Sequence, residues 1–432
     1  MFLSILREGI VQPGRIAAIW VGLALALVSN SDATAQGSIT LAKTLQLSLA
    51  HNRDLQLYPY QRNSSEALLL QAGLRPQPRA ELTVENALGT GDYNSFEASE
   101  TTLAMSQVIE LGEKRKQRIA VARAQRDQLS TEYEMSRLDV LAESSRRYYR
   151  VLALQTKAEI NVQRLKEDLK ALAAISSRTR AGAAAAADVS KLELRVARSR
   201  ATKQKLDNER NLAARRLAAM WQAEPDFDRV EGDLSVIPAL PTLPALRLAI
   251  NRTPSLEQQF ALQRLADARV ELAQASSRGD LTLELGLRHL EASNDQALVF
   301  SVAMPLNFSN PNEGRIRAAR ADREGSARKT ELLMKTLEME LVQVYQQLKN
   351  NRDKALQVRD ELLPRSRKLI EDTRRGYQLG QYSVLQWTDA QAERFALEGE
   401  LIDLYSAVYL QLLELERITG EPLVGVTEGD IL

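Results

Sequence analysis

The sequence contains no cysteine and only two histidines, His51 and His289, among its 432 residues. Without cysteine there can be no disulfide, no thiolate metal site, no cysteine nucleophile and no lipid on an N-terminal cysteine. A zinc or copper site would have to rest mainly on carboxylates, which is uncommon for these metals. No Gly-Lys phosphate loop or serine elbow stands in a strand-turn-helix context. We therefore expect no catalytic residue, no cofactor, no metal site, and a protein that is not an enzyme.

Aromatic residues and excess charge are also scarce. Aromatics make up 5% of the chain, which is low for an enzyme with a large compact core. Lys and Arg number 57 against 56 Asp and Glu, so the broad basic surface typical of nucleic-acid binding is missing. We expect no nucleic-acid partner.

Long apolar runs are missing beyond the N-terminus. Residues 1–35 read as a signal peptide, with Arg7 and Arg15 before the apolar run 16–28 and a small-x-small cleavage site at 33–35. The mature chain would then begin at Gln36. No later stretch approaches 18 apolar residues. We expect an exported protein in which any membrane span consists of strands.

One stretch of the sequence occurs twice. In each copy an extended segment leads through a short break into a long helical pattern, at 103–124 and again at 300–321. Residues at identical spacing in the two copies are Arg118, Ile119, Ala122, Arg123 and Ala124, matched 197 positions later by Arg315, Ile316, Ala319, Arg320 and Ala321. The agreement extends over most of the mature chain and indicates an internal duplication.

The duplication divides the chain into two structural repeats. We expect the first at 36–225, with a helix, a β-hairpin over 79–109 and long helices. A linker rich in Pro and Asp follows at 226–244. The second repeat, 245–422, has a helix, a hairpin over 280–306 and long helices, and 423–432 form a C-terminal tail.

Local patterns give the elements within these repeats. Helices are predicted over 41–73, with a break at Pro59, and over 246–276. The first hairpin has a strand that includes Leu82, Val84 and Leu88 and a turn at 89–94. A second long helix is predicted from Gly314, kinked at Pro364.

The most extended element is a helix from about Glu113 to Thr179, a stretch without Pro or Gly. At 1.5 Å per residue it would be roughly 100 Å long. A coiled-coil seam is predicted through residues at 4-3-4-3 spacing: Ala158, Val162, Leu165, Leu169 and Leu172.

The strands alternate in a way that gives two different faces. Leu281, Leu283, Leu285 and Leu287 fall on one face, and Thr282, Glu284 and Arg288 on the other. Four strands cannot close on themselves, and open edges cannot face lipid. If these strands cross a membrane, several chains must combine them, with the leucines facing lipid and the polar side facing a wet lumen.

The junction at Ser106–Arg115 resembles that of the TolC family of outer-membrane efflux proteins, with Glu110, Leu111, Gly112 and Arg115 as the junction motif. Met304–Leu306 followed by Asn312–Ile316, which includes Gly314, is similar to the CzcC-like branch found with heavy-metal efflux pumps. The resemblance covers about 39–422.

This resemblance implies a mainly α protein with a small β part. Three chains would each give four strands to one shared β-barrel in the outer membrane of a Gram-negative bacterium. Their long antiparallel coiled-coil helices would form a periplasmic α-helical barrel, with the linker at its waist. Such a homotrimer is a passive duct that contacts outer-membrane lipid and works with a periplasmic adaptor protein and an inner-membrane resistance-nodulation-division pump.

The resemblance also implies roles for the far ends of the helices. The helix-helix tips, which would contact the adaptor, match Gly182 in the first repeat and Leu379 and Gly380 in the second. Acidic residues six and nine positions after the second glycine would narrow the entrance. Asp389 matches the second of these, and a solvated helix face is its alternative interpretation. Gln386 replaces the first, which departs from the double acidic pattern.

Several functions stay open. The leading hypothesis is an outer-membrane duct for divalent heavy-metal cations. The same duct could serve organic toxins, drugs or protein secretion, because selectivity would belong to the pump and adaptor. A third hypothesis, of another class, is a periplasmic coiled-coil structural protein.

Overall fold

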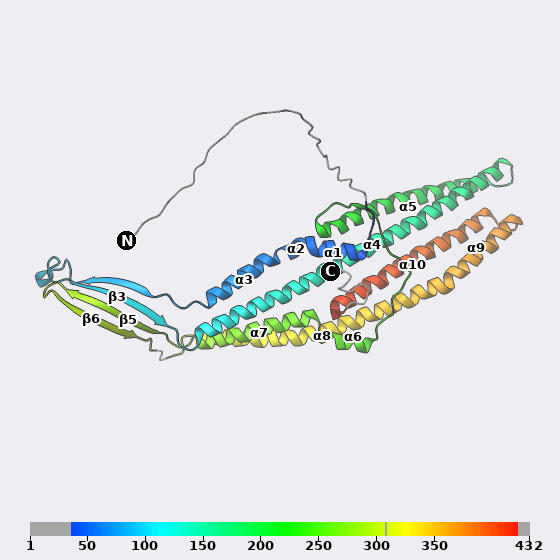
Figure 1. The fold of residues 1–432 in the computed structure, drawn as a ribbon. Coiled ribbons are helices and arrows are strands. Elements are labelled where there is room, and N and C mark those ends of the chain that lie inside the picture. The colour runs from blue at the N-terminus through cyan, green and yellow to red at the C-terminus, as the bar shows by residue number, and fades with distance from the viewer. Residues whose placement is uncertain (1–35, 307–308, 422–432) are drawn as a thin grey trace, which may run out of the picture.

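The computed structural model describes residues 36–306 and 309–421 and shows a long, narrow molecule with a sheet at one end and helix tips at the other (Figure 1). The expected signal peptide, 1–35, and tail, 423–432, lie outside the described residues.

Each repeat has the same order of elements. The first contains short helices, two strands and two long helices: α1 (Leu41–His51), α2 (Arg53–Gln56), α3 (Tyr58–Ala72), β2 (Arg79–Glu85), β3 (Glu100–Ile109), α4 (Lys114–Arg180) and α5 (Ala186–Ala218). The second contains α6 (Leu243–Ile250), α7 (Pro254–Ala275), β5 (Leu281–Leu290), β6 (Asp295–Ala303), α8 (Glu313–Gln357), α9 (Leu363–Gln378) and α10 (Val384–Thr419). Short 3₁₀ turns occur at Gly91–Tyr93 and Ala219–Trp221.

Local sequence explains most helix boundaries. Thr40, Thr253 and Ser383 each cap a helix by accepting a hydrogen bond from a backbone N–H in its first turn. Proline occupies the first turn of α3, α6, α7 and α9, where its missing N–H costs nothing. Before Pro364 the chain forms a π-helical segment, Val358–Leu362, which confirms a distortion at the predicted kink.

Some expected boundaries were wrong. The break expected at Pro59 is present two residues earlier, at Leu57, and Pro59 lies in the first turn of α3; a further break, at Asn52, was not expected. Leu88 is not in a strand; it has a positive φ of 58° in the loop after β2. The helix predicted over 246–276 begins at Leu243 and is interrupted at Asn251–Thr253, where Thr253 caps α7 ahead of Pro254.

The linker between the two repeats, residues 226–244, contains a strand that sequence patterns did not predict. β4 (Phe227–Val230) pairs in parallel with β1 (Gln36–Ile39) as a separate two-stranded sheet. The hydroxyl of Tyr148 donates to the carbonyl oxygens of Ile39 and Glu231, which fixes this small sheet on α4. The larger hydrophobic core surrounds it and joins α4, α5, α8 and α10.

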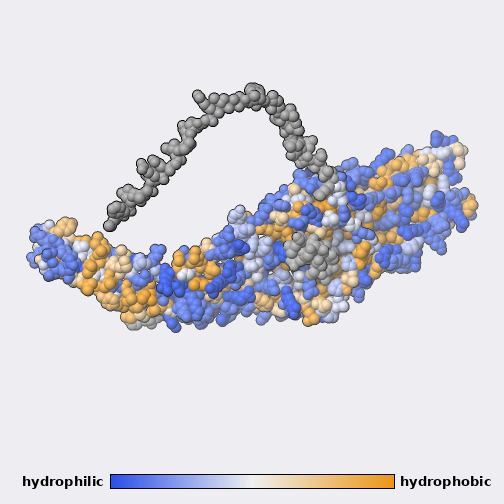
Figure 2. Space-filling view, viewed as in Figure 1, coloured by the Kyte–Doolittle hydropathy of each residue, from blue (hydrophilic) through white to orange (hydrophobic). Residues whose placement is uncertain are grey.

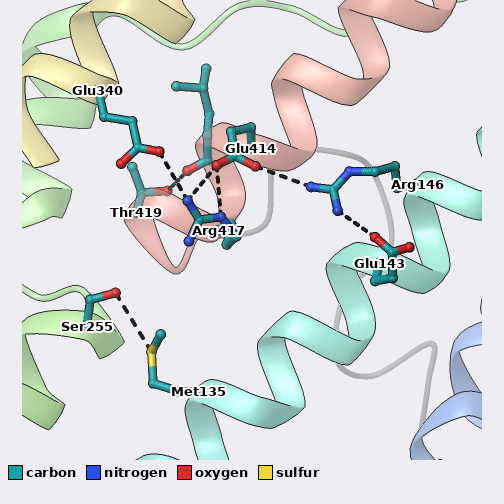
Figure 3. Close-up of polar contacts among 9 residues, drawn as sticks. Met135, Glu143, Arg146, Ser255, Glu340, Glu414, Arg417 and Thr419 are labelled. Carbon is teal, nitrogen blue, oxygen red and sulfur yellow. Dashed lines mark hydrogen bonds and ion pairs between the residues drawn. The ribbon is translucent and has the colours of Figure 1, made fainter.

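Ion pairs tie the helices together beside this core (Figure 3). Arg417 on α10 contacts Glu340 on α8 at 3.2 Å, and Arg146 on α4 contacts Glu414 on α10 at 3.3 Å. Arg146 also contacts Glu143 one turn earlier at 2.6 Å. These contacts connect both repeats at the middle of the molecule.

Candidate functional site

The four-stranded sheet at the end of the molecule has two chemically different faces, as the alternation of apolar and polar residues in the sequence predicted. Its strand order is β2-β3-β5-β6, all antiparallel, so directly paired residues lie on the same face. One row across the sheet is Leu82, Leu103, Leu287 and Leu298, and the next is Ala80, Met105, Leu285 and Phe300. Figure 2 shows hydrophobic residues gathered over this sheet, whereas the long helices are largely hydrophilic. The large side chains of these rows are exposed.

The opposite face carries a cluster of charged and polar side chains around Arg288, which is partly exposed. Its guanidinium donates to Thr102 Oγ1 at 3.0 Å, Glu100 Oε2 at 2.9 Å and Glu85 Oε2 at 3.1 Å. These partners come from β2 and β3, so one side chain links three strands on the polar face. Thr282 and Glu284 lie on the same face by register.

The first strand-helix junction is held by two acidic residues. Glu110, directly after β3, binds Arg118 in α4 through both carboxylate oxygens, and Arg118 Nη2 also donates to the Leu74 carbonyl at 3.1 Å. The hydrogen bond with Glu110 raises the pKa of Arg118. Asp280, just before β5, accepts from the Leu111 N–H at 3.1 Å and from Lys114 Nζ at 2.7 Å. The junction therefore joins the end of one hairpin to the start of the other.

Glycine is required at one junction only. Gly112 has φ of +75°, and an added Cβ would lie 2.7 Å from the Arg278 side chain. Gly314, in the first turn of α8, has no described heavy atom within 4 Å of such a Cβ. Asn312 precedes α8 there, and its amide donates to the Ala273 carbonyl at 2.9 Å. Arg115 is exposed in the first turn of α4.

The two helix tips at the far end have matching backbone geometry. Gly182 has φ of +74° and Gly380 of +75°, which ends the preceding helix in a left-handed residue. The N–H of Ala183 donates to Arg178 O, and the N–H of Gln381 donates to Gly376 O, both at 2.8 Å. Leu379, beside the second glycine, is exposed.

A small second core holds the tips together. Ala171 and Ile175 of α4 and Leu192 of α5 pack with Val384 of α10. Tyr377 stacks on Trp387 with ring centroids 5.6 Å apart, and Arg178 lies 5.0 Å over the Tyr377 ring. The cation-π contact joins the end of α4 to the end of α9.

The two residues considered for the entrance lie in α10. Gln386 caps the helix: its side chain accepts from the Ser383 N–H at 2.8 Å while the Ser383 hydroxyl accepts from the Gln386 N–H. The Asp389 side chain is 80% exposed and lies 3.9 Å from Arg195 on α5.

Arg195 also contacts a buried acid that sequence patterns missed. Asp168 on α4 is 1% exposed, pairs with Arg195 at 2.7 Å and accepts from the Ser199 hydroxyl at 2.6 Å. The predicted seam was partly wrong here. Val162 and Leu169 are exposed, and the buried stripe passes through Asn161 and Asp168 instead. Asn161 and Asp168 are seven residues apart, which is the repeat of a coiled-coil seam. Sequence patterns assign polar residues to the solvent-exposed surface, so these two were not included in the predicted seam.

Between the two tips and the main core, charged side chains of α4 contact charged side chains of α10. Glu167 contacts Arg394 at 3.1 Å, and Lys157 contacts Asp403 at 2.5 Å. A cavity of about 720 Å³ opens between them. Within the described ranges, no group of His, Asp or Glu side chains is arranged to hold a metal ion. None of the described helices is both long and apolar enough to cross a membrane.

Comparison with known proteins places this geometry in a family. Residues 44–222 match the family model of the outer membrane efflux protein. The chain is 24% identical over 419 residues to the cobalt-zinc-cadmium resistance protein CzcC of Cupriavidus metallidurans, covering 93% of this chain and 98% of CzcC. The fold is similar to the crystal structure of CusC, with a TM-score of 0.74 at 14% identity over 88% of this chain and 91% of that one. It is also similar to the outer membrane protein VceC of Vibrio cholerae, with a TM-score of 0.71 at 17% identity over 88% and 96%. Over residues 44–222 the chain is therefore similar to the outer membrane efflux protein family, whose members are channels of the outer membrane and not enzymes.

Proposed function

We propose that this chain is the passive outer-membrane duct of a tripartite efflux system that exports divalent heavy-metal cations. The observation that carries the duct is the two-faced sheet continuous with long helices: an exposed apolar face on one side and the Arg288 cluster on the other. The similarity to CzcC over 93% of the chain supports heavy-metal cations as the substrate class.

The proposed assembly is a homotrimer. Within the described chain, β2 and β6 each have a strand neighbour on one side only. Pairing β2 of one copy with β6 of the next would satisfy both edges and close the sheet into a ring. The apolar face would then contact lipid and the polar face would line the duct.

The proposed partners follow from the opposite end of the molecule. The tips at Gly182 and at Leu379 and Gly380 are exposed and jointly supported by the second core, which suits a docking surface for a periplasmic adaptor. Asp389 would face the entrance. The energy would come from an inner-membrane resistance-nodulation-division pump.

The absence of a described metal cluster is compatible with export of metal ions, because a duct with tight ligands would retain its cargo. The alternative substrates, organic toxins, drugs or secreted proteins, would use the same architecture. A periplasmic coiled-coil structural protein would not need an exposed apolar sheet face, and the family argues against it.

A growth experiment tests the proposal. A deletion strain is grown with zinc, cobalt, cadmium, nickel or copper, and in parallel with bile salts, dyes and hydrophobic drugs. We expect sensitivity to metals alone, restored by the intact gene and not by a variant lacking residues 281–304. Sensitivity to drugs alone would overturn the substrate, and an intact protein found in the soluble periplasmic fraction would overturn the duct.

A further inference from the structure

The cavity of about 720 Å³ beside the contact between Lys157 and Asp403 has an apolar wall. Among the described residues, its lining comes from four helices: α4, α5, α8 and α10. Ile160 of α4, Leu206 of α5 and Phe395 of α10 supply apolar surface from three of them. The volume lies within the range of pockets that hold small organic molecules, ~300–1,000 Å³. Such a wall suits the flat body of an aromatic ligand.

A glycine in the middle of a helix leaves the cavity open. Gly399 lies inside α10 (Val384–Thr419) and lines the cavity. Glycine weakens a helix interior relative to alanine, so its presence there calls for a reason. No described heavy atom lies within 4 Å of a Cβ added at Gly399, so packing within the described chain does not require it. The space above this glycine is available to a ligand.

The rim of the cavity is charged, and most of its charges are paired. The charged residues among the described lining are three bases and two acids: Lys157, Arg164, Lys354, Glu400 and Asp403. Lys157 binds Asp403 at 2.5 Å, and Lys354 binds Glu400 at 2.6 Å. Each acid therefore already has a lysine, and Arg164 is the base left over on the rim.

Two polar side chains of α4 have atoms that lack a hydrogen-bond partner at this cavity. Arg164 Nε has none among the described residues, and the nearest carboxylate oxygen, of Asp168, is 3.9 Å away. Asn161 is 5% exposed, and its buried Oδ1 also has no partner in the described chain. Residues three apart lie on the same side of a helix, ~5–6 Å apart at Cβ. A ligand would satisfy both by accepting from Arg164 and donating to Asn161.

The cavity lies on the side of the helices turned away from the linker. Gln155 on α4 donates to the linker carbonyl of Val230, and Lys157 is two residues further on, ~200° around the helix. On α10, the hydroxyl of Tyr409 donates to a linker carbonyl, whereas Ala407, two residues earlier, lines the cavity. If the linker surrounds the waist of the proposed ring, this cavity faces the inside of the duct. That placement rests on the proposed function.

We propose that this cavity binds a hydroxylated aromatic acid. The ring would pack on Phe395 and Leu206, the carboxylate would accept from Arg164, and the hydroxyl would donate to Asn161 Oδ1. A divalent cation fits less well, because it would have to displace the lysine from each acid on the rim. A ligand bound in the wall of the duct would narrow it.

Binding to the purified, full chain tests the site without depending on the ring. The probe is 4-hydroxy-2-naphthoate, measured by equilibrium dialysis in a nonionic detergent. We expect saturable binding by the unaltered protein, and binding at least fivefold weaker for 2-naphthoate, which lacks the hydroxyl, and for 1-naphthol, which lacks the carboxylate. Equal binding of all three compounds would overturn the proposed recognition.

Two substitutions at one glycine separate volume from helix stability. Gly399→Leu places a side chain in the cavity and should weaken binding at least tenfold. Gly399→Ala favours the helix equally well while filling little of the cavity, and should bind within twofold of the unaltered protein. Undiminished binding by Gly399→Leu would place the probe elsewhere and overturn the inference.

The two polar contacts are tested by matching each variant to one analogue. Arg164→Gln should abolish the preference for the hydroxynaphthoate over 1-naphthol, and Asn161→Leu the preference over 2-naphthoate. Lys166→Gln is the matched control for charge, because Lys166 is an exposed base on α4 that does not line the cavity. It should keep both preferences. A structural role of Arg164 alone would change stability and leave the preferences intact, which would contradict the proposal.

Conductance in planar bilayers tests the inward placement. We expect 4-hydroxy-2-naphthoate to reduce the current through the unaltered channel reversibly, and to leave the current through the Gly399→Leu channel unchanged. Binding without any reduction of current would overturn the placement inside the duct and keep the site. An unaltered protein that forms no channels would overturn the proposed function, whereas the dialysis result would still decide whether the cavity binds the acid.

Discussion

Arg118 in α4 binds both carboxylate oxygens of Glu110, the residue that follows β3. The pair lies at the point where the sheet becomes the helical rod, and the Glu110 side chain is largely buried. We expect Glu110→Gln to lower the free energy of unfolding by ~1–3 kcal/mol, because a partly buried guanidinium loses its charged partner. Urea unfolding of the purified protein measures this.

The control for that change is Lys116→Gln. Lys116 contacts Glu113 at 2.9 Å, but both side chains are mostly exposed, so the expected loss is below ~1 kcal/mol. Equal losses from the two variants would contradict a structural role for the Glu110–Arg118 pair.

The long helices could be predicted because their signals are local. The stretch between Glu113 and Arg180 contains no Gly or Pro, and α4 fills nearly all of it. The alternation from Leu281 to Arg288 likewise indicated where β5 begins and which residues share each of its faces. In contrast, β1 and β4 have only four residues each and depend on a partner far away in sequence, so neither carries a recognisable pattern.

The candidate sites were less predictable. The two tip glycines end their helices with positive φ, which a sequence can indicate. Asp168 and Asp280 could not be found in this way, because each acts through residues from another element: Arg195 on α5, and Leu111 and Lys114 at the other hairpin. From sequence alone, an isolated Asp in a charged helix or loop is predicted to be a solvent-exposed surface residue.

The two junction glycines should respond differently to alanine. Gly112→Ala should destabilise the protein by ~1 kcal/mol or more, because φ is +75° and the new methyl would meet Arg278. Gly314→Ala should be neutral or stabilising by up to ~1 kcal/mol, since alanine favours a helix. Thermal unfolding of both variants provides the comparison, and equal destabilisation would show that the second junction has an unrecognised constraint.

Substitutions of Arg195 and Asp389 should differ in their effect on the free energy of unfolding. Arg195→Ala removes the nearer of the two arginines beside the buried Asp168 and leaves only Arg164, at 3.9 Å, so we expect a loss of up to ~3 kcal/mol. Asp389→Asn removes an exposed carboxylate and should cost less than ~1 kcal/mol.

If Asp389 lines the entrance as proposed, Asp389→Asn should lower the cation preference of single channels in planar bilayers. Asp403→Asn serves as a control, because it too removes an exposed acid on α10, farther from the tip. Unchanged ion selectivity with normal conductance would remove Asp389 from the proposed entrance.

The free energy of unfolding should depend on pH through Glu143, which lies beside the main core. Burial acts to raise the pKa of this carboxyl, but hydrogen bonds from Arg147 and Arg146 outweigh it and hold the pKa below its ordinary value of 4.5. A lowered folded pKa contributes stability above pH ~4.5 that is lost as the pH falls through the folded value. We therefore expect Glu143→Gln to be less stable than the unaltered protein at pH 7, with the difference shrinking below pH ~4.5. A constant difference across that range would assign the effect to packing.

The two faces of β5 should differ sharply in their tolerance of charge. Leu285 lies on the exposed apolar face and Glu284, the adjacent residue, on the polar face. A lysine facing the middle of a bilayer costs ~2–4 kcal/mol, whereas one facing a wet lumen costs little. We expect Leu285→Lys to reduce the amount of assembled protein in outer-membrane fractions severalfold, and Glu284→Lys to leave it near normal while changing ion selectivity. Both variants add one lysine to the same strand, so their difference reports the face alone. The reverse result would mean that the polar face, with Arg288, is the one directed outward.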